Sequence, residues 1–474
     1  MSARRDQLLF LDGEWVAGAS SRPVLDRWNG TEIGSVAIAG AGQAGAAVDA
    51  AARALDTPLP VPERAAILAR TAAGIAARAE EFATLITAET GKPITAARGE
   101  VGRAVETLGW AAEEARRLPT ETVALDATAA GAGTMAFTLA EPRGIVAAIT
   151  PFNFPLNLVL HKVAPALAAG CAVVLKPSDK AVLVAGALIE VLTEAGLPAG
   201  RVNLVTGSAG TIVDEWIADD RVAVITFTGS SRVGWELKAR SPRKLHVLEL
   251  GSNTAMVVGA SADVPRAAAD AVTAALSNSG QACVSLQRLY VVRERYDQLV
   301  AELQTRFAAA PVGDPYREET LVGPMITPAA TDGLHESITR AVTEGARVLV
   351  GGEVRAGVLT PTLLADAPDS AAIVCEEAFG PVLSVIAVTD VAEGISRVNA
   401  SEYGLNTALY TADLAEAMHY ARTAEAGSVL INMPPSFRAD QMPYGGVKGS
   451  GQGTEGVKYA IHELVQHKLV VFKP

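Results

Sequence analysis

Short apolar runs alternate with segments of helical period between residues 143 and 259. The runs are rich in β-branched residues and recur at 144–149, 172–175, 202–205, 222–227, 246–250 and 255–258. Helix-period segments such as Val182 to Ala195 separate them. A run that is apolar on both faces is typical of a strand buried in a parallel sheet. The pattern therefore predicts an α/β fold built on a doubly wound parallel sheet.

A second rhythm of the same kind extends from Ala260 to about Asn432. Its period changes predict, in order, helix 264–276, strand 288–292, helix 296–308, helix 328–344, strand 346–350, strand 382–388, helix 391–399 and strand 428–431. These strands need a sheet of their own, so we expect a second α/β domain. A site that uses residues of both domains would lie in the cleft between them.

The N-terminal third predicts a hairpin followed by helices. Residues 8–18 indicate a hairpin, because Asp12-Gly13 supplies the positive φ that a tight turn requires. Alanine-rich helices are expected from Gly42 to about Leu118. Proline and glycine predict breaks in this region at 58–62 and 91–93.

Two distant segments alternate polar and apolar residues and are expected to pair. One extends from Thr122 to Leu139, and the other covers 462–472. Each of them alone would leave an open sheet edge, and pairing closes one edge of each.

Composition and charge narrow the function classes. The chain has 474 residues, of which 49% are hydrophobic, and a formal net charge of −12. The negative charge disfavours nucleic acid or an anionic membrane as a general partner. No apolar run reaches the roughly 18 residues of a membrane span, and the first residues lack a signal-peptide pattern. We therefore expect a cytoplasmic protein.

Cysteine is rare, and one of the three stands in a reactive context. Cys171, Cys283 and Cys375 are too few for a disulfide framework and indicate free thiols. A lone cysteine is commonly just a small buried hydrophobe. Cys283 differs because Gly280 and Gln281 stop the preceding apolar pattern, which places it at a bend before a strand. Cys283 is therefore a candidate nucleophile.

Residues at the ends of the predicted strands supply partners for such a nucleophile. Asn153 could hold an oxyanion together with the Cys283 backbone N–H. Glu249 ends an apolar run, and burial there would give its carboxyl the raised pKa that suits a base for water. No histidine stands in an obvious pairing motif, which disfavours a papain-like arrangement.

A nucleotide site is predicted at the same edge of the sheet. Gly229 to Gly234 follows a strand and opens a helix, so its N–H groups could hold a phosphate. Lys176, Ser178 and Asp179 follow a neighbouring strand and offer groups for a ribose. A strand-ending turn is the alternative explanation of Lys-Pro-Ser, and the nearby glycine loop favours the nucleotide.

Seven motifs together resemble the NAD(P)-dependent aldehyde dehydrogenase superfamily. They are Thr150-Pro151-Phe152-Asn153-Phe154-Pro155, Lys176-Pro177-Ser178, Phe227-Thr228-Gly229-Ser230, Glu249-Leu250-Gly251, Gly280-Gln281-Ala282-Cys283, Glu376-Glu377-Ala378-Phe379-Gly380-Pro381 and Pro443-Tyr444-Gly445-Gly446-Val447-Lys448-Gly449-Ser450-Gly451. The likeness covers nearly the whole chain in order. It implies a Rossmann-type cofactor domain (1–121 and 141–250), an α/β catalytic domain (251–439) and a small β oligomerisation domain (122–140 and 440–474). It also implies a homodimer or homotetramer.

The resemblance assigns the chemistry to five residues. Cys283 would attack an aldehyde to form a thiohemiacetal, whose oxyanion Asn153 and the Cys283 N–H hold. Hydride passes to nicotinamide, and Glu249 activates the water that hydrolyses the resulting thioester. Lys162 and Glu455 match positions of a proton relay.

The implied cofactor is NAD, with NADP possible, and no metal ligand is assigned. Lys176, Ser178 and Asp179 would hold the adenosine ribose. The other implied contacts are Gly207, Gly229, Ser230 and Val233 to adenine and pyrophosphate, Glu377 and Phe379 to the nicotinamide ribose, and Thr150, Phe152, Phe227, Gly234, Leu250 and Gly251 elsewhere along the cofactor. Asp179 stands where many relatives carry Glu, which weakens a choice between NAD and NADP.

The substrate is expected to be a small aldehyde. Glu249-Leu250-Gly251-Ser252-Asn253 and Ser285-Leu286-Gln287-Arg288 resemble the branch that includes lactaldehyde, sulfolactaldehyde and phosphonate-aldehyde dehydrogenases. That branch favours small and often anionic aldehydes, although Ala282 and Val284 beside the nucleophile are apolar. The candidate substrate contacts are Arg103, Trp110, Phe154, Arg438 and Tyr444, the last replacing the phenylalanine of the common Pro-Phe-Gly-Gly motif. Arg103 could equally be a solvated or salt-bridged helix residue.

Two alternatives stay open at this point. A CoA-acylating enzyme would pass the thioester to CoA, but such chemistry does not need the water-activating base Glu249. An inactive member acting as a binding or structural protein would not need Cys283, Asn153 and Glu249 together.

Overall fold

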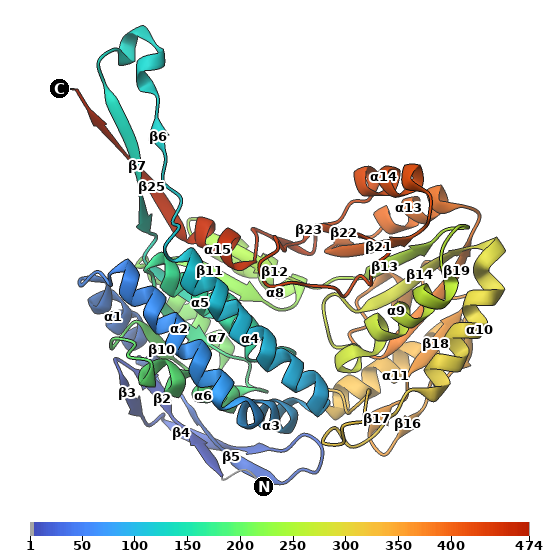
Figure 1. Ribbon diagram of the computed structural model, residues 1–474. Helices are drawn as coiled ribbons and strands as arrows, with labels where there is room; N and C mark the ends of the chain where they lie inside the picture. Colours follow the sequence, from blue (N-terminus) through green and yellow to red (C-terminus); the bar gives the residue numbers. More distant parts are fainter. Residues whose placement is uncertain (1–3, 474) are drawn as a thin grey trace.

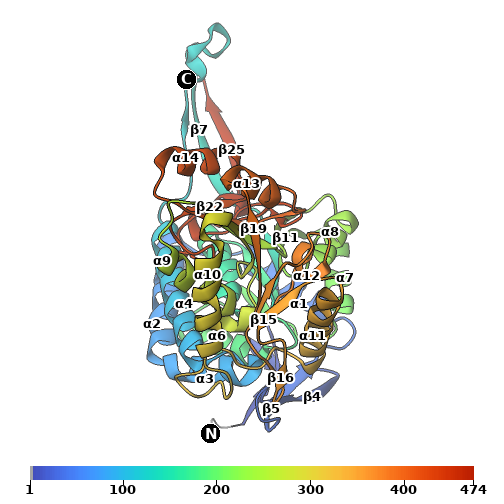
Figure 2. The ribbon, with the colours of Figure 1, turned by 90° about the vertical axis from the view of Figure 1, so that its right-hand side faces the viewer.

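A computed structural model describes residues 4–473 of the protein. The chain forms two α/β halves that face each other, and a narrow arm projects from the first half (Figure 1). The view turned by 90° shows that the arm stands clear of both halves (Figure 2).

The first half is built on an eight-stranded sheet in the order β24-β12-β11-β8-β9-β10-β2-β3. Its five central strands are parallel, as predicted. They are β8 (Ile145–Ile149), β9 (Ala172–Lys176), β10 (Val202–Leu204), β11 (Val222–Thr228) and β12 (Leu245–Glu249). Antiparallel strands from both ends of the chain form its edges: the predicted hairpin of β2 (Leu9–Leu11) and β3 (Glu14–Val16), and β24 (Gly451–Gln452).

The sixth run of the first rhythm does not belong to this sheet. It forms β13 (Thr254–Val258), which lies in the sheet of the second half, so its assignment to the first sheet is wrong. The physical reason is the short connection from Glu249 to Thr254. A parallel neighbour in the same sheet needs a crossover of a dozen or more residues.

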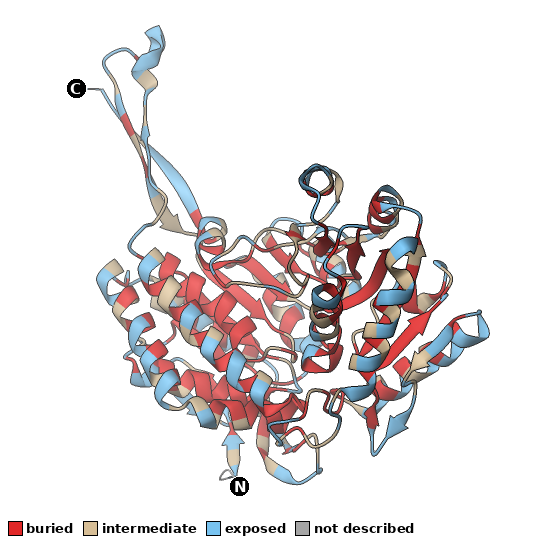
Figure 3. Cartoon of the chain, turned by 45° about the vertical axis from the view of Figure 1, so that its right-hand side comes forward, coloured by how far each residue is buried: buried red, intermediate tan, exposed pale blue. Residues whose placement is uncertain are grey.

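Helices cover both faces of the first sheet. Val146 and Ala148 of β8 pack into one core, while Ile145, Ala147 and Ile149 pack into another. The first core is covered by α2 (Val61–Ala77), α3 (Ala79–Thr90), α4 (Ile94–Glu114), α5 (Asn157–Ala169) and α6 (Val182–Glu194), and the second by α1 (Gln43–Leu55), α7 (Ala209–Ala218) and α8 (Ser231–Arg240). Burial on both faces explains why these strands are apolar throughout (Figure 3).

Glu89 fixes the segment that connects β9 to α6. The side chain before α6 belongs to Ala181 and cannot cap the helix. The carboxylate of Glu89, on α3, accepts hydrogen bonds from the N–H groups of Val182 (2.7 Å), Leu183 (2.9 Å) and Val184 (2.9 Å). Because these donors have no partner inside the helix, Glu89 stabilises the end of α6 that follows Lys176 to Asp179.

The second half contains a seven-stranded sheet in the order β15-β18-β19-β14-β13-β21-β22. Only β15 (Arg347–Val350) is antiparallel to its neighbour, and the other strands are β14 (Leu286–Val292), β18 (Thr362–Ala365), β19 (Val382–Val388), β21 (Asn406–Tyr410) and β22 (Ser428–Ile431). Its helices are α9 (Val264–Leu276), α10 (Arg293–Ala309), α11 (Pro328–Thr343), α12 (Ala372–Cys375), α13 (Val391–Asn399) and α14 (Leu414–Thr423). Two short strand pairs flank it: β16 (Val354–Arg355) with β17 (Val358–Leu359), and β20 (Tyr403–Gly404) with β23 (Val447–Lys448).

The arm is the predicted pair of alternating segments. Strand β25 (Val465–Phe472) pairs antiparallel with β7 (Met135–Pro142), which also pairs with β6 (Thr122–Val123). Residues 462–464, expected to be extended, end helix α15 (Val457–Leu464) instead. A further sheet that the sequence did not predict, β1 (Arg5–Gln7), β5 (Glu32–Ile38) and β4 (Ser20–Leu25), lies near the N-terminus. Within residues 4–473, no helix is both long and apolar enough to cross a bilayer.

Candidate active site

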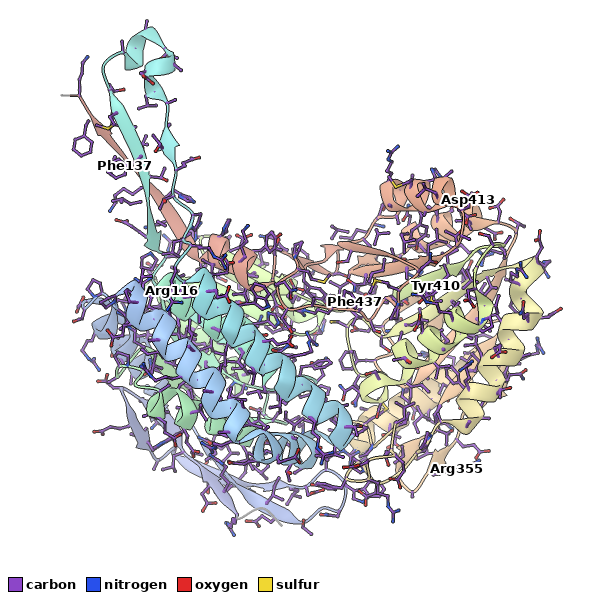
Figure 4. The ribbon with its side chains drawn as sticks, viewed as in Figure 1. Arg116, Phe137, Arg355, Tyr410, Asp413 and Phe437 are labelled. Carbon is purple, nitrogen blue, oxygen red and sulfur yellow. The ribbon has the colours of Figure 1, made fainter. Side chains whose placement is uncertain are left out.

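A cavity of about 230 Å³ lies between the two halves. The first half lines it with residues that follow β8, β11 and β12, at the carboxyl edge of the first sheet. The second half contributes Cys283, Glu377 and Phe379. Residues 432–446, called the crossing segment here, lead from β22 towards β24 and contribute Arg438 and Tyr444. Phe437 of this segment lies between the two halves in Figure 4.

The cavity brings together residues predicted to be catalytic, to bind the cofactor and to bind the substrate. Those lining it are Phe152, Asn153, Gly229, Ser230, Glu249, Leu250, Gly251, Cys283, Glu377, Phe379, Arg438, Tyr444 and Glu455. Pro151, Leu158 and Thr228 line it as well and were not predicted. Pro151 and Thr228 stand inside recognised motifs, whereas nothing in the sequence distinguishes Leu158 on α5.

A left-handed turn places Cys283 between α9 and β14. Asn278, Ser279 and Gly280 have φ values of 53°, 55° and 70°. The amide of Asn278 donates to the carbonyl oxygens of Asn153 (3.2 Å) and Gln281 (3.1 Å), which offsets its backbone strain. A Cβ at Gly280 would lie 2.0 Å from the carbonyl oxygen of Gly380, so only glycine fits there.

The Cys283 thiol is held in apolar surroundings. It packs with Ala282, Val284 and Phe154, and its Sγ lies 3.1 Å from the hydroxyl oxygen of Tyr444. Burial raises the pKa of the Cys283 thiol to about 11, and the hydrogen bond to Tyr444 acts in the opposite direction. The sulfur therefore needs help from its neighbours to become a thiolate.

Two residues of the cavity lining, Asn153 and Cys283 itself, offer N–H donors. The Asn153 amide donates to the carbonyl oxygen of Gln281 (3.1 Å), and its nitrogen carries a second hydrogen that this bond does not use. The backbone N–H of Cys283 has no acceptor among residues 4–473. A pair of free donors at a nucleophile is the arrangement that stabilises an oxyanion.

Glu249 provides a carboxyl group on the same cavity. It is 4% exposed, and neither of its carboxylate oxygens has a hydrogen-bond partner within residues 4–473. Burial raises the pKa of Glu249 well above its usual value, and the nearby Glu455 carboxylate raises it further. A carboxyl group with a raised pKa and free oxygens is suited to accept a proton from water.

Lys162 and Arg438 hold the charge of Glu455. The Lys162 ammonium lies 3.1 Å from one Glu455 oxygen, and the Arg438 guanidinium lies 2.8 Å from the other. Burial alone would raise the pKa of Glu455, but these two cations keep it well below its usual range. Arg438 also stacks on the Tyr444 ring, with 3.8 Å from its guanidinium carbon to the ring centroid. Its Nε has no partner in the described chain.

The edge of the first sheet fits the phosphates and ribose of a dinucleotide. Helix α8 begins after Gly229 without a side-chain cap, which leaves its first N–H groups available for an anion. The buried hydroxyls of Thr150, Thr228 and Ser231 have no hydrogen-bond partner within residues 4–473. The Lys176 ammonium lies 2.8 Å from the Asp179 carboxylate after β9. Unpartnered hydroxyls along a helix N-terminus are what a bound nucleotide would satisfy.

Glu377 and Phe379 enter the cavity from the second half. The Glu377 carboxylate accepts a hydrogen bond from the Ser252 N–H (2.9 Å), and burial raises the pKa of Glu377 to about 7. Phe379 has a φ of 47° and contacts Phe152 edge to face, with 6.0 Å between the ring centroids. The two aromatic rings join the halves at one wall of the cavity.

Arg103 does not line the cavity. Its guanidinium donates two hydrogen bonds to Asp440, at 2.6 and 3.1 Å. Asp440 also accepts from the Asn157 amide (3.1 Å) and lies 2.8 Å from His161 Nε2. Arg103 is therefore a salt-bridged helix residue, the alternative to its role as a substrate contact. Asp440 was not predicted, because its partners on α4 and α5 are about 300 residues away in the chain.

The other predicted residues surround the cavity without lining it. Phe154 packs against Cys283, Trp110 packs against the first core, and Lys162 reaches the cavity through Glu455. Lys176 ends β9, and Thr150, Ser178, Asp179 and Gly207 follow β8, β9 and β10. Phe227 precedes the N-terminal end of α8, and Val233 and Gly234 lie in its first turn. A Cβ at Gly234 would come within 2.3 Å of the Leu250 side chain.

Known proteins share this sequence and fold over nearly their whole length. Residues 15–470 match the aldehyde dehydrogenase family. The 3-sulfolactaldehyde dehydrogenase of Priestia megaterium is 40% identical over 464 residues, covering 98% of this chain and 97% of the relative. A lactaldehyde dehydrogenase of Methanococcus maripaludis is 34% identical over 469 residues, covering 98% and 99%.

The fold of the chain also matches that of a solved structure. The NADP-dependent glyceraldehyde-3-phosphate dehydrogenase of Bacillus halodurans, complexed with NADP, superimposes with a TM-score of 0.96 at 32% identity and covers 99% of both chains. Sequence and fold agree along the whole chain, so the family assignment extends to both halves and to the arm. The chain belongs to the aldehyde dehydrogenase family.

Proposed function

We propose that the chain oxidises a small aldehyde to its carboxylic acid with NAD or NADP. The observation that carries this proposal is the convergence of Cys283, Asn153 and Glu249 on one cavity between the halves. A thiol, an oxyanion donor and a base for water are the groups that such an oxidation requires. The relatives named above support the reaction class.

The first chemical step belongs to Cys283. Its thiolate adds to the aldehyde carbon, and the Asn153 amide and the Cys283 N–H stabilise the oxyanion of the thiohemiacetal. The cofactor, when bound, supplies the acceptor for the hydride, which converts the thiohemiacetal to a thioester. The residues proposed to hold it are those at the carboxyl edge of the first sheet, with Glu377 and Phe379 facing them.

Glu249 acts on the thioester. Its free carboxylate oxygens take a proton from water, and the resulting hydroxide attacks the thioester carbon. The bond between that carbon and the Cys283 sulfur then breaks, which releases the acid and restores the thiolate. Glu455 and Lys162 are the proposed route by which that proton leaves, because Glu455 lines the same cavity and contacts Lys162 directly. This hydrolytic role of Glu249 supports release of an acid over transfer to CoA.

We propose an anionic or hydroxylated aldehyde as the substrate. Arg438 lines the cavity, and its buried Nε has no hydrogen-bond partner among the described residues, so its guanidinium has donor capacity left for an anion or a hydroxyl. Sulfolactaldehyde carries both groups, and lactaldehyde carries the hydroxyl. Arg103 contributes to this recognition through Asp440 and the crossing segment, without touching the substrate.

An initial-rate panel tests the substrate class. Sulfonated, phosphorylated, carboxylated, hydroxylated, alkyl and aromatic aldehydes are compared with NAD and with NADP. We expect kcat/KM to be highest for small aldehydes with an anionic or hydroxyl group. Arg438→Met should lower kcat/KM for those aldehydes by about 10- to 100-fold, the value of one hydrogen bond to a charged group. Because Arg438 also contacts Glu455 and Tyr444, Arg438→Met should lower kcat/KM for simple alkyl aldehydes too, but by a smaller factor. An equal loss for alkyl and for anionic or hydroxylated aldehydes would contradict the proposal.

The three parts of the fold have proposed roles. The first half (1–121 and 141–250) would bind the cofactor, residues 251–439 would carry the nucleophile, and the arm with the C-terminal segment (122–140 and 440–474) would join copies into a homodimer or homotetramer. Cys171, Cys283 and Cys375 are free thiols. This supports a reducing compartment and hence the proposed cytoplasmic location.

A further inference from the structure

Tyr444 occupies a fixed position against the nucleophile. Its side chain is 2% exposed, and its hydroxyl lies 3.1 Å from Cys283 Sγ. Its backbone N–H donates to the carbonyl oxygen of Glu455 (3.0 Å), and the Glu455 N–H donates back (2.6 Å). These two bonds fix the backbone of the crossing segment beside the cavity. The position of the Tyr444 hydroxyl next to the sulfur is therefore set by the fold.

Arg438 makes the phenol a better donor. Its guanidinium covers one face of the Tyr444 ring at 3.8 Å from the centroid. A cation on the ring face draws electron density from the phenol, which makes its hydroxyl a stronger hydrogen-bond donor. The stacking also fixes the plane of the ring. Burial and the nearby Cys283 raise the pKa of Tyr444 well above its usual value, so the phenol keeps its own proton.

Of the charged groups around the sulfur, the two carboxyl groups oppose its ionisation and only Arg438 favours it. Glu249 from β12 and Glu377 after α12 both oppose a negative sulfur, and Arg438 of the crossing segment is the cation that favours it. That cation is already shared with Glu455. No histidine lines the cavity among the described residues. A neutral donor in contact with the sulfur is therefore the remaining local source of stabilisation.

We propose that the Tyr444 hydroxyl is a catalytic residue that donates its hydrogen bond to the Cys283 sulfur, increasing the thiolate fraction and fixing the direction of attack. The proposal rests on the proposed role of Cys283 as nucleophile. It gives a chemical meaning to the tyrosine that replaces the more common phenylalanine in Pro443-Tyr444-Gly445-Gly446. The proton that leaves Cys283 passes to water in the cavity, and Tyr444 stays protonated throughout.

Tyr444→Phe tests this role, because it removes the hydroxyl and keeps the ring beneath Arg438. The rate of Cys283 alkylation by iodoacetamide is measured against pH in the oligomer without aldehyde or cofactor. The measurement uses a Cys375→Ser background, since Cys375 is exposed and would also react. We expect the midpoint of the alkylation profile to rise by about one pH unit, which corresponds to about tenfold less thiolate at neutral pH.

Tyr420→Phe is the matched control. Tyr420 is fully buried and its hydroxyl bonds to Thr407, so this variant also loses one buried hydrogen bond, but it does so in the hydrophobic core of the second half, under α14. Its alkylation midpoint should equal that of the parent. Equal midpoints for Tyr444→Phe and the parent would overturn the proposal, and so would the same shift in both variants. Because alkylation requires no turnover, the result is independent of the proposed substrate.

Steady-state kinetics give a second readout. The acid limb of kcat/KM against pH should move upward in Tyr444→Phe by the same amount as the alkylation midpoint. Tyr444→Leu, which also removes the ring beneath Arg438, should show this shift together with weaker use of anionic aldehydes. An acid limb that stays in place in both variants would contradict the role of the hydroxyl.

Discussion

Glu249 is a buried carboxyl group that faces the cavity with both oxygens free among residues 4–473. Glu249→Gln keeps its size and removes its ability to accept a proton from water. We expect steady-state turnover to fall by about 10²- to 10⁴-fold, the usual contribution of general base catalysis. The first turnover should still release reduced cofactor, because the thioester forms before water is activated.

Stopped-flow absorbance at the reduced-cofactor band distinguishes these two phases. A burst of up to one equivalent per site, followed by a slow phase, is the expected record for Glu249→Gln. Glu376→Gln is a suitable control, because Glu376, next to Glu377 in the chain, does not line the cavity. Unchanged steady-state turnover in Glu249→Gln would refute the role of this base.

Glu377 makes stability depend on pH. Its folded-state pKa is raised to about 7 by burial, above the ordinary value of 4.5. The folded state therefore binds more protons than the unfolded state between these values, and stability falls as pH rises from 4.5 to 7. Below pH 4.5 both states are protonated and the penalty disappears.

Glu377→Gln should remove this part of the pH dependence. We expect the variant to gain about 1–3 kcal/mol relative to the parent on going from pH 5 to pH 8. Thermal unfolding followed by circular dichroism at the two pH values measures the difference. If parent and variant change equally between them, the Glu377 carboxyl does not carry the effect.

At the scale of single residues, the sequence predicts side chains that follow a strand or break a helix. Asn153 and Glu249 directly follow or end buried runs, and Cys283 follows a glycine that interrupts a helical pattern. The sequence did not predict contacts between segments that are far apart in the chain. The hydrogen bond between Tyr444 and Cys283 and the ion pair between Arg103 and Asp440 depend on how the crossing segment packs, which no local pattern specifies.

The crossing segment is the element that completes the cavity, and Asp440 anchors it to the first half. Asp440 is 1% exposed and contacts Arg103, His161 and Asn157 on α4 and α5. Burial alone would raise the pKa of Asp440, but His161 and Arg103 hold it well below its usual range. The anchor thus depends on a charged carboxylate.

Asp440→Asn should loosen this anchor. It leaves Arg103 and His161 without their charged partner and should destabilise the protein by about 2–4 kcal/mol. Because Arg438 and Tyr444 lie on the same segment, kcat/KM should also fall, by about tenfold or more. Differential scanning calorimetry and initial rates measured well below the unfolding temperature test the two effects. Arg103→Gln should show smaller changes in the same direction, because Arg103 is partly exposed.

At the scale of elements, long periodic segments were predictable and short ones were not. The central strands of the first sheet and the longer helices have a clear period over many residues, whereas α12 and α14 of the second half were not predicted. β18 and β21 were missed because their apolar runs are only four and five residues long. The sheet of β1, β5 and β4 was missed because its strands expose alternate polar side chains and hold little apolar pattern.

At the scale of the whole molecule, the arm is where a single copy of the chain exposes large apolar side chains. Strands β7 and β25 project from the first half, and Phe137 lies on the arm in Figure 4. Met135, Leu139, Leu469, Val471 and Phe472 are 43–58% exposed there, an unusual density of large apolar side chains for solvent. Both outer edges of the three-stranded sheet are also unpaired in residues 4–473.

We expect a second copy of the chain to cover these side chains, in line with the assembly proposed above. Leu469 and Val471 lie on one face of β25, so Leu469→Asp with Val471→Asp places two charges on that face. We expect this double variant to be a monomer at micromolar concentration while the parent is a dimer or tetramer, as measured by size-exclusion chromatography with light scattering. Leu414→Asp is the matched control, because Leu414 is 76% exposed on α14, away from the arm. An unchanged assembly in the double variant would exclude this face of the arm from the interface.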